Sequence, residues 1–86
     1  MNGGYDSGYQ RCPCFWGRGP GRLVQHLAGF VSDFETLRVL DAGCGEGKNS
    51  HFLAMRGAHV RAIDISEAAI ANGRNAFNGN GNISWE

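Results

Sequence analysis

The feature that most constrains this chain is residues 39–47, a short apolar run that ends in an alternation of glycines. Gly43, Gly45 and Gly47 stand at every second position directly after Val39, Leu40, Asp41 and Ala42. Glycine adopts positive φ readily and lets a ligand approach the main chain closely. The segment therefore predicts a strand that runs into a ligand-binding turn.

A second apolar run, residues 62–65, carries a carboxylate at Asp64. In open parallel sheets, ligands bind outside the carboxyl ends of the strands. A carboxylate at such a strand end can accept hydrogen bonds from both hydroxyls of a ribose. The two runs together predict a site for a nucleotide cofactor.

The remaining pattern predicts helices that alternate with parallel strands. Apolar residues recur every three or four positions from Pro20 to Phe34, which predicts one amphipathic helix of about twelve to fifteen residues. Strands are expected at residues 37–41 and 59–64, and the start of a third at residues 82–86. This order is typical of a parallel α/β sheet.

Two further helices are expected between these strands. One opens near Lys48, and Gly57 is placed to end it with a positive φ. Ser66 is a good N-cap for the other, and Glu67 favours its first turn.

Asp41, Gly43, Gly45 and Gly47 resemble motif I of the class I S-adenosylmethionine-dependent methyltransferases, and Asp64 matches the acid that follows it. Residues 43–49, with Trp16 and Gly17 upstream, are most similar to the small-molecule methyltransferases of the tellurite-resistance and thiopurine type. The resemblance implies an α/β fold, the N-terminal portion of a Rossmann-like parallel sheet with flanking helices, incomplete. We expect an irregular N-terminal arm at residues 1–19 and a partial cofactor-binding domain at residues 20–86.

The resemblance also implies that S-adenosylmethionine is the cofactor. Asp64 would hold the ribose, and Ile65 would face the adenine. Asp41 would hold the amino group, directly or through water, or else cap the amides of its own loop. The predicted cofactor-binding residues are Asp41, Gly43, Cys44, Gly45, Gly47, Asp64, Ile65 and Trp16. No residue is a credible general base, so no catalytic residue is assigned.

Several residues near the turn have two interpretations. Glu46 and Lys48 are expected to be exposed and solvated. Asn49 either caps the following helix or touches the ligand. Cys44 is expected to be structural, the alternative being a thiol activated by the following helix. Trp16 either lies against the cofactor or packs on the next helix.

No metal site is predicted. Cys12 and Cys14 are separated by a single proline, which is closer than the usual spacing of a zinc or redox pair. The three histidines, His26, His51 and His59, show no ligand spacing.

The net charge of zero, with 8 basic and 8 acidic residues, argues against a nucleic-acid or anionic-membrane surface. No apolar run is long enough to span a membrane, and the N-terminus lacks the regions of a signal peptide, so a cytoplasmic location is expected. With 86 residues the chain buries a small core, and we expect an uncovered sheet edge. Because of this uncovered edge, we expect the chain to aggregate, to stay molten, or to pair with a second chain that completes the sheet.

The leading hypothesis is the cofactor-binding part of a methyltransferase that acts on a small molecule, inactive as this chain alone. A truncated non-catalytic fragment, or a module completed by another chain, is the alternative. A nicotinamide-dependent oxidoreductase is disfavoured, because its fingerprint places the third glycine three positions after the second, whereas Gly47 comes two after Gly45.

Overall fold

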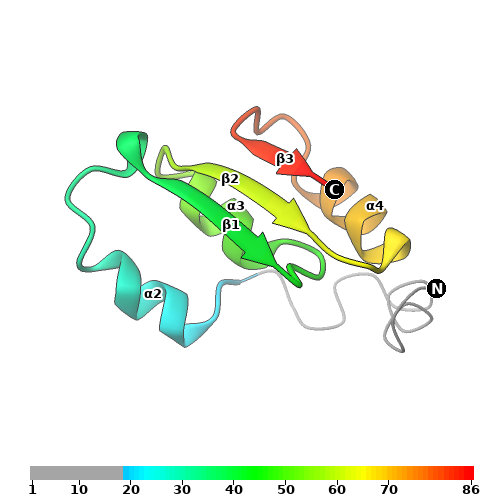
Figure 1. The fold of residues 1–86 in the computed structure, drawn as a ribbon, viewed down its shortest axis with the longest axis horizontal. Helices are drawn as coiled ribbons and strands as arrows, with labels where there is room; N and C mark the ends of the chain where they lie inside the picture. Colours follow the sequence, from blue (N-terminus) through cyan, green and yellow to red (C-terminus); the bar gives the residue numbers. More distant parts are fainter. Residues whose placement is uncertain (1–18) are drawn as a thin grey trace.

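The structure is a computed structural model that describes residues 19–86. Trp16, Cys12, Cys14 and nearly all of the predicted N-terminal arm lie outside the described residues. The described elements follow in the order α2 (Arg22–Ala28), the 3-10 turn η1 (Phe34–Thr36), β1 (Arg38–Ala42), α3 (Lys48–Ala54), β2 (His59–Ile63), α4 (Glu67–Ala76) and β3 (Ile83–Trp85) (Figure 1).

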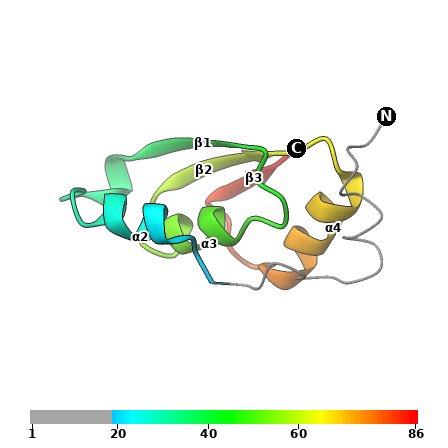
Figure 2. The ribbon, with the colours of Figure 1, turned by 90° about the horizontal axis from the view of Figure 1, so that it is seen from below.

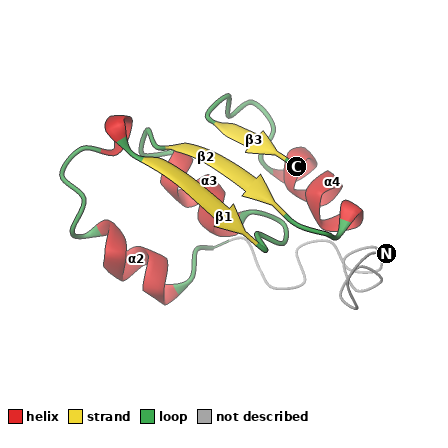
Figure 3. Cartoon of the chain, in the orientation of Figure 1, coloured by secondary structure: helices red, strands yellow, loops and turns green. Residues whose placement is uncertain are grey.

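The three strands form one parallel sheet in the order β1-β2-β3 (Figure 3). Val39 of β1 is opposite Val60 of β2, which is in turn opposite Ile83 of β3. The buried core lies between β2, β3 and α3, and its members are Ala54, Ala58, Val60, Ala62 and Ile83. The predicted incomplete Rossmann-like α/β fold is confirmed.

The described helices all lie on one side of the sheet (Figure 2). The opposite face carries side chains that are exposed: Arg38, Leu40, His59, Arg61 and Ser84. Parallel sheets are normally covered on both faces, because helical crossovers pack on each side. The described part of the chain thus presents one covered face, one bare face and open edges along β1 and β3.

The local signals for α3 and α4 are confirmed. Gly57 has φ of 108° and its amide donates to the carbonyl of Ala54, 3.0 Å away, which closes the end of α3. At the start of α4, the Ser66 hydroxyl accepts a hydrogen bond from the amide of Ala69 at 3.1 Å. Because both signals act within a few residues, the sequence was sufficient to locate them.

The predicted single helix from Pro20 to Phe34 is wrong. The helix α2 ends at Ala28, where the amide of Gly29 bonds back three residues to His26 in a tightened turn. A separate turn then starts at Asp33, whose carboxylate accepts from the amide of Glu35 at 3.0 Å. No residue of α2 is buried. Packing therefore does not favour extension of the helix through glycine, a weak helix former.

No helix in the described part of the chain is both long enough and apolar enough to cross a membrane.

Replacing Ser66 with Ala is expected to lower the free energy of unfolding by about 1 kcal/mol, because the amide of Ala69 loses its acceptor in a buried position. Urea denaturation would measure the change. The control is Ser84→Ala, at an exposed position of β3, which is expected to change stability by less than about 0.5 kcal/mol. Equal effects of the two substitutions would contradict the capping role.

Candidate cofactor site

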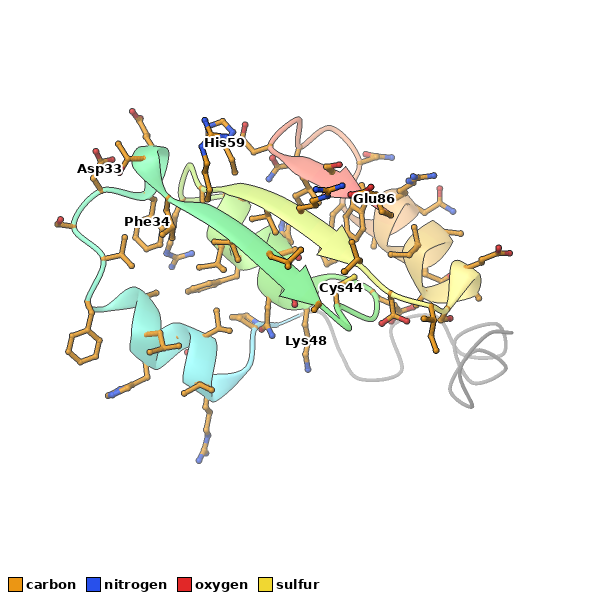
Figure 4. All side chains as sticks on the ribbon, in the orientation of Figure 1. Asp33, Phe34, Cys44, Lys48, His59 and Glu86 are labelled. Carbon is orange, nitrogen blue, oxygen red and sulfur yellow. The ribbon has the colours of Figure 1, made fainter. Side chains whose placement is uncertain are left out.

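The predicted site residues of the described chain gather at the carboxyl ends of β1 and β2. Ala42 and Ile63 are paired at the last position of the two strands. The amide of Cys44 donates to the carbonyl of Ile63 at 2.9 Å, so the pairing of the two strands continues into residues 43–47. In Figure 4, Cys44 and Lys48 mark this end of the sheet, and His59 marks the opposite end. We call residues 43–47 the glycine loop.

Asp64 connects the glycine loop to the start of α4. Its Oδ2 accepts from the amide of Gly45 and its Oδ1 accepts from the amide of Ser66, each at 2.8 Å. Each carboxylate oxygen offers two lone pairs, so both remain able to accept a further hydrogen bond from a ligand. The predicted ribose ligand is therefore also a structural residue of the loop.

The glycine loop has left-handed backbone at every second residue. The φ angles are 70° at Gly43, 58° at Gly45 and 83° at Gly47, conformations that side-chain-bearing residues adopt rarely. The space around Gly43 is open, since a Cβ built there meets no atom of the described residues within 4 Å. Gly45 and Gly47 are buried. The loop thus has an open side at Gly43 and a packed side at Gly47.

Asp41 makes a contact that the sequence did not indicate. Its Oδ2 accepts a hydrogen bond of 2.6 Å from the hydroxyl of Ser50, a fully buried residue of α3. The side chain of Asp41 lies on the helix-covered side of the sheet, and Ser50 fixes its direction.

The expectation that Glu46 is exposed is wrong. Glu46 is 8% exposed, and its Oε2 accepts a 2.7 Å hydrogen bond from Nδ2 of Asn72 in α4. Sequence reasoning missed this contact because the partner is 26 residues away, beyond the reach of any local signal.

Asn49 does not cap α3, whose N-cap is Gly47, and a contact of Asn49 with the ligand stays a prediction. Its Oδ1 accepts from the amide of Gly21 at 2.8 Å, which joins α3 to the segment that enters α2.

The thiol of Cys44 stays protonated near neutral pH. Burial, together with the negative charges of Asp41 and Asp64, raises the pKa of the thiol from 9.0 to about 12. The Sγ atom donates to the carbonyl of Gly45 at 3.3 Å. The two carboxylates that flank the loop therefore disfavour a further negative charge there and favour a cation.

Ile65 is 68% exposed beside Asp64, so an apolar surface stands next to the carboxylate. The glycine loop, its two acids and this apolar side chain all lie at the carboxyl edge of the sheet. Trp16, the remaining predicted member, lies outside the described residues.

Comparison with known proteins gives one family and several partial matches. The model of the methyltransferase domain family matches residues 39–86. The ribosomal RNA small subunit methyltransferase C of Chromohalobacter salexigens is 40% identical over 63 residues, 73% of this chain and 19% of that protein. The ubiquinone biosynthesis O-methyltransferase of Hahella chejuensis is 54% identical over 37 residues, 43% of this chain and 16% of that protein.

A solved structure concerned with the conversion of a disulfide bond into a thioacetal group during echinomycin biosynthesis also matches. Its TM-score is 0.76 at 30% sequence identity, over 95% of this chain and 36% of that chain. The chain thus spans less than a fifth of the two curated relatives and about a third of this structural relative.

The parallel sheet with a glycine loop between two acids defines a Rossmann-like cofactor-binding domain. The chain belongs to the methyltransferase domain family, in the class I S-adenosylmethionine-dependent group. S-adenosylmethionine is the cofactor of this class, and the residues present suit it, since the two carboxylates favour a cation at the loop.

Asp64→Asn is expected to lower the free energy of unfolding by about 2 kcal/mol, because one of two charge-assisted hydrogen bonds to partly buried amides is lost. Urea denaturation at neutral pH would measure it. Asp33→Asn is the control, since Asp33 accepts a single exposed bond. A loss no larger than that of Asp33→Asn would show that Asp64 does not hold the loop.

Cys44 is expected to react slowly with iodoacetamide at pH 8, because its raised pKa leaves little thiolate. In a chain with Cys12→Ser and Cys14→Ser, alkylation of the folded protein should be at least about 100-fold slower than in urea. Mass spectrometry would follow the reaction. Equal rates in the two conditions would show that the Cys44 thiol is not buried and that its pKa is not raised.

Proposed function

We propose that this chain holds the methyl donor in a methyltransferase that acts on a small molecule. The observation that carries the proposal is the open side of the glycine loop at Gly43, with the Asp64 carboxylate and exposed Ile65 beside it. Asp64 would accept the ribose hydroxyls, Ile65 would cover one face of the adenine, and Asp41 would attract the amino group. Cys44 and Gly45 would bring the main chain close to the ligand, and Gly47 would act from the packed side of the loop, against Trp85.

The charge at the loop separates this proposal from a dinucleotide site. Asp41 and Asp64 both act on the Cys44 thiol, which places negative potential at the loop. A sulfonium and an α-amino group are cationic and suited to that potential. A pyrophosphate is anionic and would be repelled. The nicotinamide-dependent alternative is therefore disfavoured by electrostatics as well as by glycine spacing.

A small-molecule acceptor is proposed from the names of the relatives. The Hahella chejuensis protein is named for O-methylation in ubiquinone biosynthesis, whereas the Chromohalobacter salexigens protein is named for ribosomal RNA. The net charge of zero favours the first kind of acceptor over a polyanion. A closer tie to the tellurite-resistance and thiopurine type, and a cytoplasmic location, are proposals from the sequence pattern alone.

Methyl transfer needs more of the domain than these residues. Transfer depends mainly on alignment of the acceptor with the donor methyl group, and the chain spans 36% of its structural relative. The open edge of β1 and the bare face of the sheet offer a place for further strands and helices, supplied by more of the same protein or by a second chain. By itself the chain would bind the donor without transferring its methyl group.

Calorimetric titration of the chain with S-adenosylhomocysteine tests the proposal. We expect saturable binding that Ile65→Ala weakens about fivefold, because about 1 kcal/mol of apolar contact is lost. Ile65 is exposed, so its replacement leaves the fold intact. Met55→Ala, an equally exposed apolar position at the end of α3, is the matched control and should bind as the parent chain does.

Two outcomes would contradict the proposal. A chain that is folded by circular dichroism but does not bind S-adenosylhomocysteine does not hold the donor. Tighter binding of NADH than of S-adenosylhomocysteine would instead favour the oxidoreductase.

A further inference from the structure

The packed side of the glycine loop rests on β3 and α4, two elements that carry none of the predicted cofactor residues. The indole of Trp85, in β3, covers Gly47, since a Cβ built on Gly47 would come within 2.4 Å of the ring. The same ring covers Gly73 in α4, where a built Cβ would come within 2.5 Å of it. One indole edge therefore fills the space between the loop and the helix.

Gly73 also touches the loop directly. A Cβ at Gly73 would stand 2.6 Å from the backbone carbonyl oxygen of Glu46. Main chain of α4 and main chain of the loop thus approach as closely as a glycine allows.

The side chain of Glu46 provides a second connection to the same helix. Asn72 donates its Nδ2 to the Glu46 carboxylate at 2.7 Å, one residue before Gly73. Arg74, one residue after Gly73, donates Nη2 to the carbonyl of Trp85 at 2.9 Å. Three consecutive residues of α4 therefore hold the loop and the end of β3 together.

We infer that Asn72, Gly73 and Trp85 are positioning residues for the cofactor. They do not touch the cofactor themselves and act on it through Glu46 and Gly47. They fix the packed side of the loop, while the ligand meets the open side at Gly43. The left-handed backbone at Gly43, Gly45 and Gly47 has no side chains of its own to hold its shape. Asp64 supplies part of that support at the amide of Gly45. Asn72, Gly73 and Trp85 supply it at Glu46 and Gly47. This inference rests on the proposed binding of S-adenosylmethionine.

Calorimetry with S-adenosylhomocysteine on matched pairs of variants tests the inference. Asn72→Ala removes the tether to Glu46, whereas Asn75→Ala removes an exposed amide from the same helix, three residues on. We expect Asn72→Ala to weaken binding at least about threefold and Asn75→Ala to leave it unchanged.

The second pair separates positioning from stability. Trp85→Ala is expected to weaken binding about tenfold, and Trp85→Phe, whose shorter ring withdraws from both glycines, about threefold. The control is Ile83→Ala in the same strand, which removes a buried side chain of the core. We expect it to lower stability, measured in urea, while folded protein binds the ligand as the parent chain does.

A spectroscopic readout completes the test. Chain labelled with 5-fluorotryptophan should give a fluorine resonance for Trp85, assigned with Trp85→Phe, that shifts when S-adenosylhomocysteine binds at the far side of the loop. If Asn72→Ala and both Trp85 variants bind S-adenosylhomocysteine as tightly as the parent chain does, the positioning role is overturned. If the parent chain itself fails to bind, the proposed function has failed instead.

Discussion

The arrangement of the site depends on one carboxylate. One oxygen of Asp64 accepts a hydrogen bond from the amide of Gly45, and the other accepts one from the amide of Ser66, at 2.8 Å each. These two bonds join the loop that follows β1 to the start of α4, at the point where β2 ends. The loop and the helix are far apart in the chain, and this junction sets their relative position together with the hydrogen bond from Asn72 to Glu46. The ligand-binding edge is therefore built around an acid that is also suited to bind the ligand.

The sequence patterns predict correctly those parts of the fold that depend on interactions within a few residues of chain. Ser66 and Gly57 cap their helices within a few residues, and the apolar strands precede their turns directly. The parts that it missed depend on distant partners. The burial of Glu46 comes from α4, 26 residues on, and the contact of Asn49 comes from a segment 28 residues before it. The break at Gly29 has a different cause. Apolar periodicity predicts a long helix, but no residue of α2 is buried, so packing does not stabilise a longer one.

The charges around the loop serve structure and recognition together. Asp41 is oriented by Ser50, and Asp64 by two backbone amides, so neither carboxylate needs the ligand to be held in place. After burial, which is the largest cause, their negative charges contribute to the raised pKa of Cys44. A site whose charges are fixed before binding loses little conformational entropy when a cationic ligand arrives. The open edge of β1 lies next to this preorganised site, so whatever completes the sheet would be added beside it.

The contact of Trp85 with both Gly47 and Gly73 has a consequence for how this sequence can diverge. The indole edge fills the space that a Cβ would need at either glycine. A smaller ring at position 85 would not by itself admit a methyl group at position 73, because a Cβ there would still stand 2.6 Å from the carbonyl oxygen of Glu46. Position 73 is thus expected to stay glycine among relatives that keep this loop, even where the ring at position 85 changes. Position 47 is held to glycine separately by its positive φ.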